Sequence, residues 1–463
     1  MTAPDLLERI LARVDALRPV SGFPVVDEIR AEADRIAAAH PDRVTRTTIG
    51  ASRLGEEIVD YAVGEGPSIV IVGGVHPNEP IGFHTALALL RDLAEERGPA
   101  AELGGRWHIV PCIDPDGARL NESWFADPGD RIGYARGFYR PAPVEQVEWS
   151  FPLDHRGIVF DDPMPETRAL MGLMDETEPA LIVGLHNGEL GGVYYYATPD
   201  LVGAIDALHA IPAHLGLPLD RGEPEFAGSE PLAEAVFPEL TSIDMIDALE
   251  EMGIDPTPHV VSGGTGDYGR LFGASAFVAE LPYWSHPASD DTSGSGRSYR
   301  EVLLRRAEEL DELGAVLLRA LERAEPHLAI DSPLRRGATA FAHMMAGSGD
   351  EARQRAAAPE SDREATVAEA FSNEDHPRMF RLRFGTMLAR TLRAEVVAGT
   401  AAPAVRLALA DLETHLEAWY READAHQETL EVLPIEKLVG VQLGTVLAAA
   451  DAALALRAPG APG

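Results

Sequence analysis

Residues 69–80, IVIVGGVHPNEP, are the stretch of sequence that decides the fold. Their first half is an apolar run, broken only by two glycines, which is typical of a β-strand buried on both faces of a sheet. Polarity changes abruptly at His76, where Pro77 directs the chain away from helical geometry. Glu79 follows just before Pro80, a favoured first residue of a helix. An imidazole and a carboxylate on a turn after a strand are suitable ligands for Zn²⁺.

Composition limits the classes of protein that this chain can belong to. Its 463 residues, 45% hydrophobic and 25% charged, indicate a globular protein with a large domain and an appendage. The net charge of -36 argues against nucleic acid and anionic membrane as partners. The single cysteine, Cys112, permits no intramolecular disulfide. The N-terminus lacks the pattern of a secretory signal, and no stretch looks long enough to span a bilayer, so we expect a cytoplasmic protein.

The first 300 residues alternate between helical and strand patterns. Two helices are expected within residues 5–39 and a strand hairpin within 43–64, and after the opening strand come a helix from residue 83, a strand near 107–113, a helix near 165–176 and a strand at 181–186. This alternation predicts an α/β fold with helices on both faces of the sheet. Ligands of such sheets bind beyond the strand ends.

From about residue 300 the pattern becomes helical. A long amphipathic helix is followed by a predicted loop or linker at 346–363 and by helices at 376–398, 402–425 and 434–457. We therefore predict a catalytic domain at 1–299 and a helical C-terminal region at 300–463. The helical region is expected either to pack on the enzyme as a bundle or to form homo-oligomers.

A third metal ligand is predicted at His186. It ends the apolar strand LIVGLH and is followed by Asn187 and Gly188, so it is placed in the same way as His76. An imidazole at the end of an apolar strand contributes little to a hydrophobic core, which favours a functional-site residue over a surface residue.

Four further short motifs occur along the chain, and their order and spacing are informative together. They are HPNE at 76–79, DPDG at 114–117, PETRAL at 165–170 and LHNG at 185–188. Together they resemble the zinc carboxypeptidase family, the carboxypeptidase A-like metallopeptidases, over roughly residues 40–285. The resemblance implies a mixed, largely parallel sheet and one zinc ion held by His76, Glu79 and His186, the ligand types of the carboxypeptidase A site. It also implies a peptide or small amide as substrate.

The same resemblance suggests residues that act beside the metal. Glu280, in AFVAEL, matches the family's general base, and Arg119, just after DPDG, matches the arginine that polarises the scissile carbonyl. The stretch SGGTGDYG at 262–269 resembles a conserved family loop. Counting back from it places His259 where the family has a substrate-contacting tyrosine, with Tyr268 as a weaker substitute.

The sequence departs from the family at QVEWSFP, residues 146–152. Where the family has an Asn-Arg pair that binds the substrate carboxylate, this chain has Glu148 and Trp149. Aligning the motif with NESWF instead places Asn121 at the asparagine and an acid at the arginine, so the pair is lost either way. Gln146 replaces the aspartate expected to orient the first zinc histidine. The carboxylate grip could come from another arginine, with candidates Arg131, Arg136, Arg140 and Arg156.

Three functions fit these residues. The first is a zinc-dependent amide or peptide hydrolase in which Glu280 is the general base for metal-activated water. The second is a zinc deacylase or amidase whose substrate carries an amine or hydroxyl that meets Glu148 in place of a terminal carboxylate. The third is an inactive zinc-binding scaffold whose helical region recruits a partner, although the presence of Glu280 argues against it.

Overall fold

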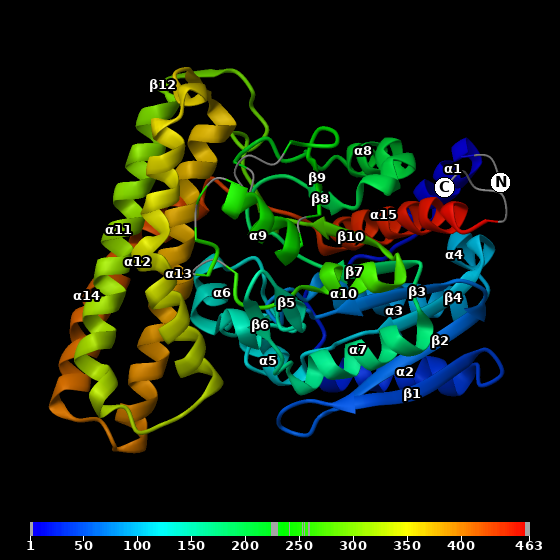
Figure 1. Ribbon diagram of the computed structural model, residues 1–463, viewed down its shortest axis with the longest axis horizontal. Helices are drawn as coiled ribbons and strands as arrows, with labels where there is room; N and C mark the ends of the chain where they lie inside the picture. Colours follow the sequence, from blue (N-terminus) through cyan, green and yellow to red (C-terminus); the bar gives the residue numbers. More distant parts are fainter. Residues whose placement is uncertain are drawn as a thin grey trace.

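A mixed β-sheet lies at the centre of the protein (Figure 1). The computed structural model describes residues 3–223, 230–239, 241–251, 253, 255–257 and 260–458. Within them, eight strands form one sheet in the order β1-β2-β4-β3-β7-β10-β8-β9. Their bounds are β1 Val44–Ala51, β2 Glu57–Glu65, β3 Ser68–Gly73, β4 Gly105–Val110, β7 Leu181–Leu185, β8 Tyr194–Ala197, β9 Val236–Pro238 and β10 Ser275–Glu280.

The middle of the sheet is parallel and its edges are mixed. Strands β4, β3, β7 and β10 run in the same direction. The pairs β1–β2, β2–β4 and β8–β10 are antiparallel, and β9 pairs parallel with β8. The predicted hairpin is confirmed as the β1–β2 pair, and the predicted strands at 69–73, 107–110 and 181–185 are confirmed at the parallel centre. The α/β fold class is therefore confirmed.

Helices cover both faces because alternate strand residues point to opposite sides. In β3, Ile69 and Ile71 join the larger hydrophobic core, and Val70 and Val72 join a second core on the other face. The larger core contains α1 Ala3–Asp15, α2 Val26–Ala39, α3 Ile81–Ala94, α8 Ile205–Leu215 and α15 Ile435–Leu456, whereas the second contains α7 Pro165–Thr177. The first two predicted helices, the helix after Pro80 and the helix at PETRAL are thus confirmed.

Long helices stand beside the sheet as a bundle, on the side of α6 (Figure 1). They are α11 Tyr299–Ala324, α12 Pro333–Ala357, α13 Val367–Ala398 and α14 Pro403–Gln427. The loop predicted at 346–363 is wrong for most of its length, because α12 continues to Ala357. One of its glycines is a packing residue: a Cβ on Gly349 would lie 2.8 Å from the Ala307 carbonyl oxygen of α11. Gly349 thus allows two helices to approach closely instead of ending one.

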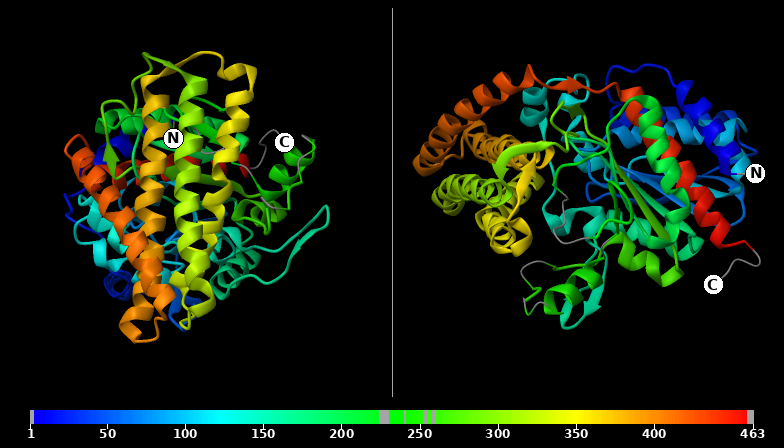
Figure 2. Two further views of the ribbon diagram at one scale, coloured as in Figure 1. Left: turned by 90° about the vertical axis from the view of Figure 1, so that its left-hand side faces the viewer. Right: turned by 90° about the horizontal axis from the view of Figure 1, so that it is seen from above.

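The final helix, α15, returns to the sheet. It packs against α3, α8 and α1 and touches β7 and β10, away from the bundle (Figure 2). The last part of the chain therefore completes the hydrophobic core around the sheet, and the domain boundary at residue 300 stays a prediction. Helix α15 also has the length and hydropathy of a membrane span, mean 1.7, contrary to the sequence expectation, but 78% of that window is buried inside the protein.

Short elements connect these layers. They are α4 Gly98–Leu103, α5 Pro115–Arg119, α6 Arg131–Gly137, α9 Ser242–Glu251, α10 Thr265–Gly269, β5 Leu153–His155, β6 Ile158–Phe160, β12 Gly294–Ser298 and β13 Glu364–Thr366. Strand β11, Trp284–Ser285, pairs antiparallel with β14, Glu431–Val432, where the chain leaves the sheet for the bundle and where it returns.

Candidate metal centre and active site

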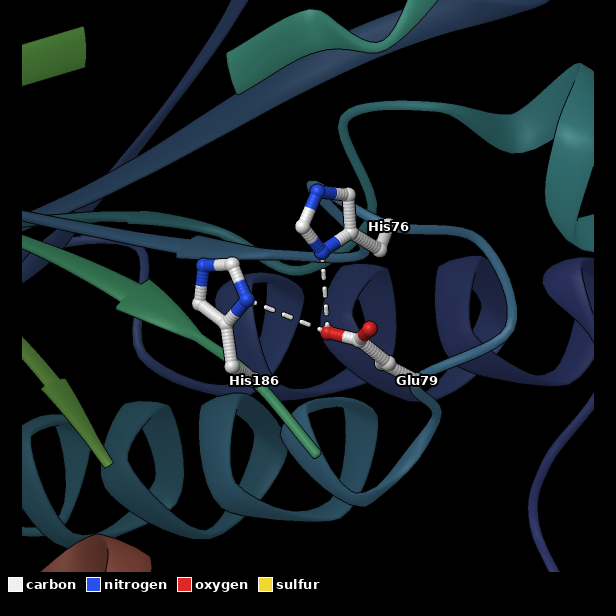
Figure 3. Close-up of side chains that lie close together, drawn as sticks. All are labelled: His76, Glu79 and His186. Atoms are coloured by element: carbon white, nitrogen blue, oxygen red, sulfur yellow. Dashed lines mark hydrogen bonds and ion pairs between the residues drawn. The ribbon is translucent and has the colours of Figure 1, made fainter. Parts of the chain in front are cut away.

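Two histidines and a glutamate meet at the ends of neighbouring parallel strands (Figure 3). One Glu79 oxygen, Oε2, lies 3.2 Å from Nδ1 of His76 and 3.1 Å from Nδ1 of His186. One ligand atom from each residue lies within 4.8 Å of the other two, and all three residues are buried. The three residues that the sequence assigns to the metal are thus brought together.

Strand register accounts for this meeting. Gly73 of β3 pairs with Leu185 of β7, so both strands end at the same level and release His76 and His186 at one edge. The turn from β3 to α3 requires Gly74, because φ at this position is +66° and the backbone lies against the ring of Phe83. The backbone N–H of Glu79 then donates to the carbonyl of His76, which folds the carboxylate back toward the imidazole.

Polar contacts from distant parts of the chain hold the ligand segments in place. The backbone N–H of Asn187 donates to Glu79 Oε2 at 3.2 Å, and the Asn187 side-chain oxygen accepts from the N–H of Ile81. From α15, Gln442 donates to the carbonyl oxygen of His186 at 3.0 Å and accepts from the hydroxyl of Thr85. The last helix of the chain therefore supports the third ligand directly.

The spacing of these atoms fits a zinc ion. Tetrahedral Zn²⁺ with nitrogen and oxygen ligands near 2.0–2.1 Å requires neighbouring ligand atoms about 3.3 Å apart. The two distances from Glu79 Oε2 to the imidazole nitrogens, 3.1 and 3.2 Å, agree with this value. The ligand types, their burial and these two distances therefore suit a tetrahedral metal ion.

Glu280 lies beside the ligand atoms. It is the last residue of β10, which runs parallel to β7 beside it, so its carboxylate leaves the sheet at the same edge. Its Oε1 atom lies 3.6 Å from Nδ1 of His186, and 11% of its side chain is exposed. A carboxylate beside the ligand atoms, with some access to solvent, can exchange protons with a group held there.

Glu148 contacts both histidines on the side away from the ligand cluster. Its two oxygens lie 3.1 Å from Nε2 of His186 and 3.4 Å from Nε2 of His76, the ring atoms that point away from the ligand cluster. A carboxylate on this nitrogen keeps the proton there and leaves Nδ1 free to bind metal. The sequence assigns Glu148 to substrate, whereas the structure places it behind the ligands.

The segment that carries Glu148 is held by helix α7. Glu148 lies in a turn of 3-10 helix, Val147–Trp149. The Thr167 hydroxyl donates to the Val147 carbonyl and also bonds the hydroxyl of Ser150. Gln146, expected to orient His76, instead accepts from Arg140 at 3.2 Å and donates to the Pro141 carbonyl. Glu148 has therefore taken the position beside the histidines that the sequence assigned to Gln146.

Arg140 is the cation of this site. Its Nη1 donates to Glu79 Oε1 at 3.0 Å, and its Nη2 lies 2.9 Å from Nε2 of His76. The Nη2 contact requires an unprotonated Nε2, whereas the Glu148 contact requires a protonated one. When Nδ1 of His76 serves as a ligand, Nε2 carries the proton, and the Arg140 guanidinium loses this partner. Arg140 then has donors available for another acceptor in the site.

Charges in the site favour a cation between the three ligands. Burial opposes the imidazolium of His186, yet Glu148 and Glu79 hold its pKa well above the usual range. Burial likewise opposes the Glu79 carboxylate, but the two imidazoles hold its pKa well below the usual range. Burial and the nearby Arg140 lower the pKa of His76. These shifts keep the Glu79 carboxylate ionised and His76 neutral, and a metal ion bound at His186 would displace the proton from its ligand nitrogen.

The structure corrects the prediction for Arg119. All three of its guanidinium nitrogens face carboxylates outside the site: Nε donates to Glu56 and Nη2 to Asp27, both at 2.7 Å, and Nη1 lies 3.9 Å from Glu122. The short helix α5 carries the side chain toward α2 and away from the ligands. Among the described residues, the arginine that contacts the metal cluster is Arg140.

Asn121 is also misassigned by the sequence. It is fully buried, and its amide donates to the carbonyls of Gly117 and Tyr139 while its oxygen accepts from the Tyr139 N–H and the Trp124 indole. These four bonds use its hydrogen-bonding capacity within the protein. Asn121 is a structural residue, and no donor or acceptor of its side chain is left for substrate.

The remaining candidates divide by position. Trp149 lies against the 262–269 loop, because a Cβ on Gly264 would come within 3.2 Å of its ring. His259 lies outside the described residues. Tyr268 bonds Asp175 and packs in the second core. The other arginines named from the sequence contact groups elsewhere: Arg131 pairs with Asp375, Arg136 lies over the ring of Tyr420, and Arg156 pairs with Asp247 and Glu250.

The helical bundle contacts the edges of the site. Arg383 of α13 pairs with Glu189, three residues after His186, and the same carboxylate accepts from Tyr134. A Cβ on Gly337 of α12 would lie 2.6 Å from the Arg140 carbonyl oxygen, so that helix packs directly on the segment that carries Arg140. Neither contact could be found from sequence, because the partners are 194 and 197 residues apart.

Comparison with known proteins agrees with this geometry. Residues 29–137 match the family model for zinc carboxypeptidase. The chain is 29% identical over 129 residues to carboxypeptidase D of Anas platyrhynchos, a match that covers 27% of this chain and 9% of that protein. The chain thus spans less than a tenth of the length of this relative.

The matches to solved structures are distant. Bovine thrombin-activatable fibrinolysis inhibitor, in complex with tick carboxypeptidase inhibitor, is 13% identical with a TM-score of 0.39, over 56% of this chain and 86% of that one. Carboxypeptidase A from Helicoverpa armigera is 14% identical with a TM-score of 0.35, over 77% of this chain and 81% of that one.

Proposed function

We propose that this member of the zinc carboxypeptidase family is an amide hydrolase that uses one metal ion and Glu280. The observation that carries the proposal is the cluster itself: three ligand atoms lie within 4.8 Å of one another, and the Glu280 carboxylate lies 3.6 Å from one of them. A zinc ion bound there would supply a Lewis acid that lowers the pKa of water and polarises an amide carbonyl.

Three residues of the chain would then have separate roles in the reaction. Glu280 takes a proton from the attacking water and gives it to the leaving amine, which the exposed 11% of its side chain allows. Arg140, once it has lost His76 as a partner, donates to the oxygen that becomes negative in the transition state. Glu148 keeps both imidazoles in the tautomer that presents Nδ1.

Substitution of Glu280 tests this proposal. We expect Glu280→Gln to bind one zinc ion per chain, as the wild type does, and to lose about 10²- to 10⁴-fold in kcat on any amide that the wild type cleaves. Glu250→Gln, a surface glutamate paired with Arg156, is the matched control. Metal content by mass spectrometry and turnover of an N-acyl peptide panel are the readouts. Full activity in Glu280→Gln would overturn the assignment of the base.

A deacylase or amidase is the second candidate function, and the place of Glu148 favours it. The residues that would bind a terminal carboxylate are absent from the expected segment, and Glu148, in their place, contacts the ligand histidines. Matched peptides with free and amidated C-termini separate the two functions. Equal kcat/KM on both would favour the amidase, whereas strict dependence on the free carboxylate would favour a carboxypeptidase that uses Arg140.

A further inference from the structure

The segment 138–146, which carries Arg140, lies between the sheet and the helical bundle. It begins where α6 ends and contains only a short turn of 3-10 helix, Pro143–Glu145, so its own secondary structure does little to fix the Arg140 side chain. From the sheet side, Asn121 bonds both the N–H and the carbonyl of Tyr139, each at 2.9 Å. The bundle supplies further contacts before, at and after Arg140.

Helix α13 holds the start of this segment. Nη1 of Arg390 donates to the carbonyl oxygens of Gly137 and Phe138, at 3.0 and 2.6 Å. Cζ of Arg383, from the same helix, lies 5.2 Å from the centroid of the Phe138 ring. Two arginines of one helix therefore fix the backbone and the aromatic ring that come just before Arg140.

Helix α12 contacts Arg140 itself and the end of the segment. Nε of Arg336 donates to Glu145 Oε1 at 2.7 Å, and Arg53 donates to the same oxygen at 3.0 Å. The next residue, Gly337, lies so close to the segment that a Cβ there would be 2.6 Å from the Arg140 carbonyl oxygen. Glycine at position 337 therefore lets the helix touch the backbone of Arg140.

The Arg140 side chain extends from this backbone to the metal ligands. Its Nη1 donates to Glu79 Oε1 at 3.0 Å, and its Nη2 lies 2.9 Å from Nε2 of His76. The ligands themselves follow strands β3 and β7, so their backbone is held by the sheet. A displacement of the segment should therefore move the guanidinium more than the ligands. A shift of about 1 Å in a positioned catalytic group can cost roughly a hundredfold in rate.

We propose that helices α12 and α13 position Arg140 for catalysis, with Gly337, Arg336 and Arg390 as the positioning residues. The inference rests on the proposed function and adds a level of control to the same site. The bundle sets the place of the cation that meets the negative charge of the transition state. The bundle thus acts on the reaction through Arg140.

Gly337→Ala tests the inference, with Gly314→Ala as its matched control. Ordinary van der Waals contact begins at 3.4 Å, so the added methyl group would force the helix and the segment apart by about 0.8 Å. We expect kcat to fall about tenfold to a hundredfold, with KM and zinc affinity within about threefold of the wild type. In Gly314→Ala the Cβ would lie 2.7 Å from the Met345 carbonyl oxygen inside the bundle, so stability should fall while kcat does not change.

A double-mutant comparison shows whether the effect passes through Arg140. In an Arg140→Ala background, Gly337→Ala should lower kcat by less than about twofold, because the group that it displaces is already absent. An equal fold-loss in both backgrounds would overturn the inference, as would wild-type kcat in a folded Gly337→Ala protein. If Gly337→Ala does not fold, Arg390→Ala replaces it, with Arg393→Ala, which loses an ion pair to Glu413 inside the bundle, as its control. Wild-type kcat in Arg390→Ala then counts against the inference.

Hydrogen–deuterium exchange separates failure of this inference from failure of the proposed reaction, because it needs no turnover. The segment 138–146 should exchange faster in Gly337→Ala than in the wild type or in Gly314→Ala. If the zinc-loaded wild type cleaves no amide while this difference is seen, the proposed reaction fails and the contact of the bundle with the Arg140 segment stands. Unchanged exchange in Gly337→Ala overturns the inference whether or not the wild type is active.

Discussion

Removal of the Glu148 carboxylate should weaken zinc binding before it affects substrate. Its oxygens lie 3.1 Å from Nε2 of His186 and 3.4 Å from Nε2 of His76, so one residue orients two ligands. Loss of such an outer contact typically costs 10- to 100-fold in metal affinity, or about 1.4–2.8 kcal/mol. This range sets the scale for the substitutions.

Two substitutions at this position should differ in size. In Glu148→Gln one amide oxygen can still accept from His186, the closer partner, but it carries no charge, so we expect the lower end, about tenfold. In Glu148→Ala both imidazoles lose their acceptor and we expect the upper end, about a hundredfold. Burial of the two histidines, whose side chains are 6% and 4% exposed, limits replacement of the carboxylate by water.

Competition against a chelator of known zinc affinity measures these losses directly. Glu250→Gln serves as the surface control, and His186→Ala sets the scale for loss of a ligand. The reasoning would be refuted if Glu148→Ala bound zinc within about threefold of the wild type while KM for the substrate rose. That result would return Glu148 to the substrate-binding role that the sequence suggests.

Two further predictions concern other buried or misassigned charges. Burial raises the pKa of Asp114 to about 7 from its usual 3.8, so stability should fall as pH rises from about 4 to 7, by at most about 4 kcal/mol at about 1.4 kcal/mol per pH unit. In Asp114→Asn the amide oxygen can still accept from the Gly117 N–H. Urea unfolding at pH 5 and pH 8 should therefore show a smaller change in the free energy of unfolding than in the wild type. An unchanged difference between the two pH values would contradict a raised pKa of Asp114. Arg140→Ala should lower kcat by at least about a hundredfold. Arg119→Ala should leave kcat within about threefold of the wild type and lower the stability only slightly. Steady-state kinetics of both variants on one substrate would show the larger loss in Arg119→Ala if Arg119 were the catalytic cation.

The parallel strands explain why much of the site could be predicted. Each of His76, His186 and Glu280 follows an apolar run, and neighbouring parallel strands end at one edge of the sheet, so polar residues at those ends must meet. The hydrophobic pattern therefore fixed both the fold class and the residues that gather at its centre. Their roles as ligands and base remain predictions until metal and activity are measured.

The rest depended on directions and distances that a sequence does not contain. Arg119 and Arg140 both follow the DPDG motif, but only the path of the intervening short helices decides which one turns toward His76. Glu148 lies in the segment 146–152 that the sequence singled out. The sequence of a 3-10 turn does not determine whether its side chain points to the substrate or to the metal ligands. The glycines near residue 348 predict a loop, but α12 continues through them, and Gly349 packs closely against α11. The apolar pattern of α15 predicted a helix correctly but could not identify its partner, the sheet.

The β11–β14 pair makes the bundle a removable insertion in the chain's architecture. Trp284 pairs with Val432 and Ser285 with Glu431, so the chain leaves and re-enters the catalytic body at nearly one point. A shortened protein that simply stopped near residue 299 would lose α15, and with it the Gln442 support of His186. Excision of the segment between the two strands, closed by a short turn, would keep both. The bundle could therefore be lost, exchanged or enlarged over evolutionary time without cutting the polypeptide that forms the metal centre.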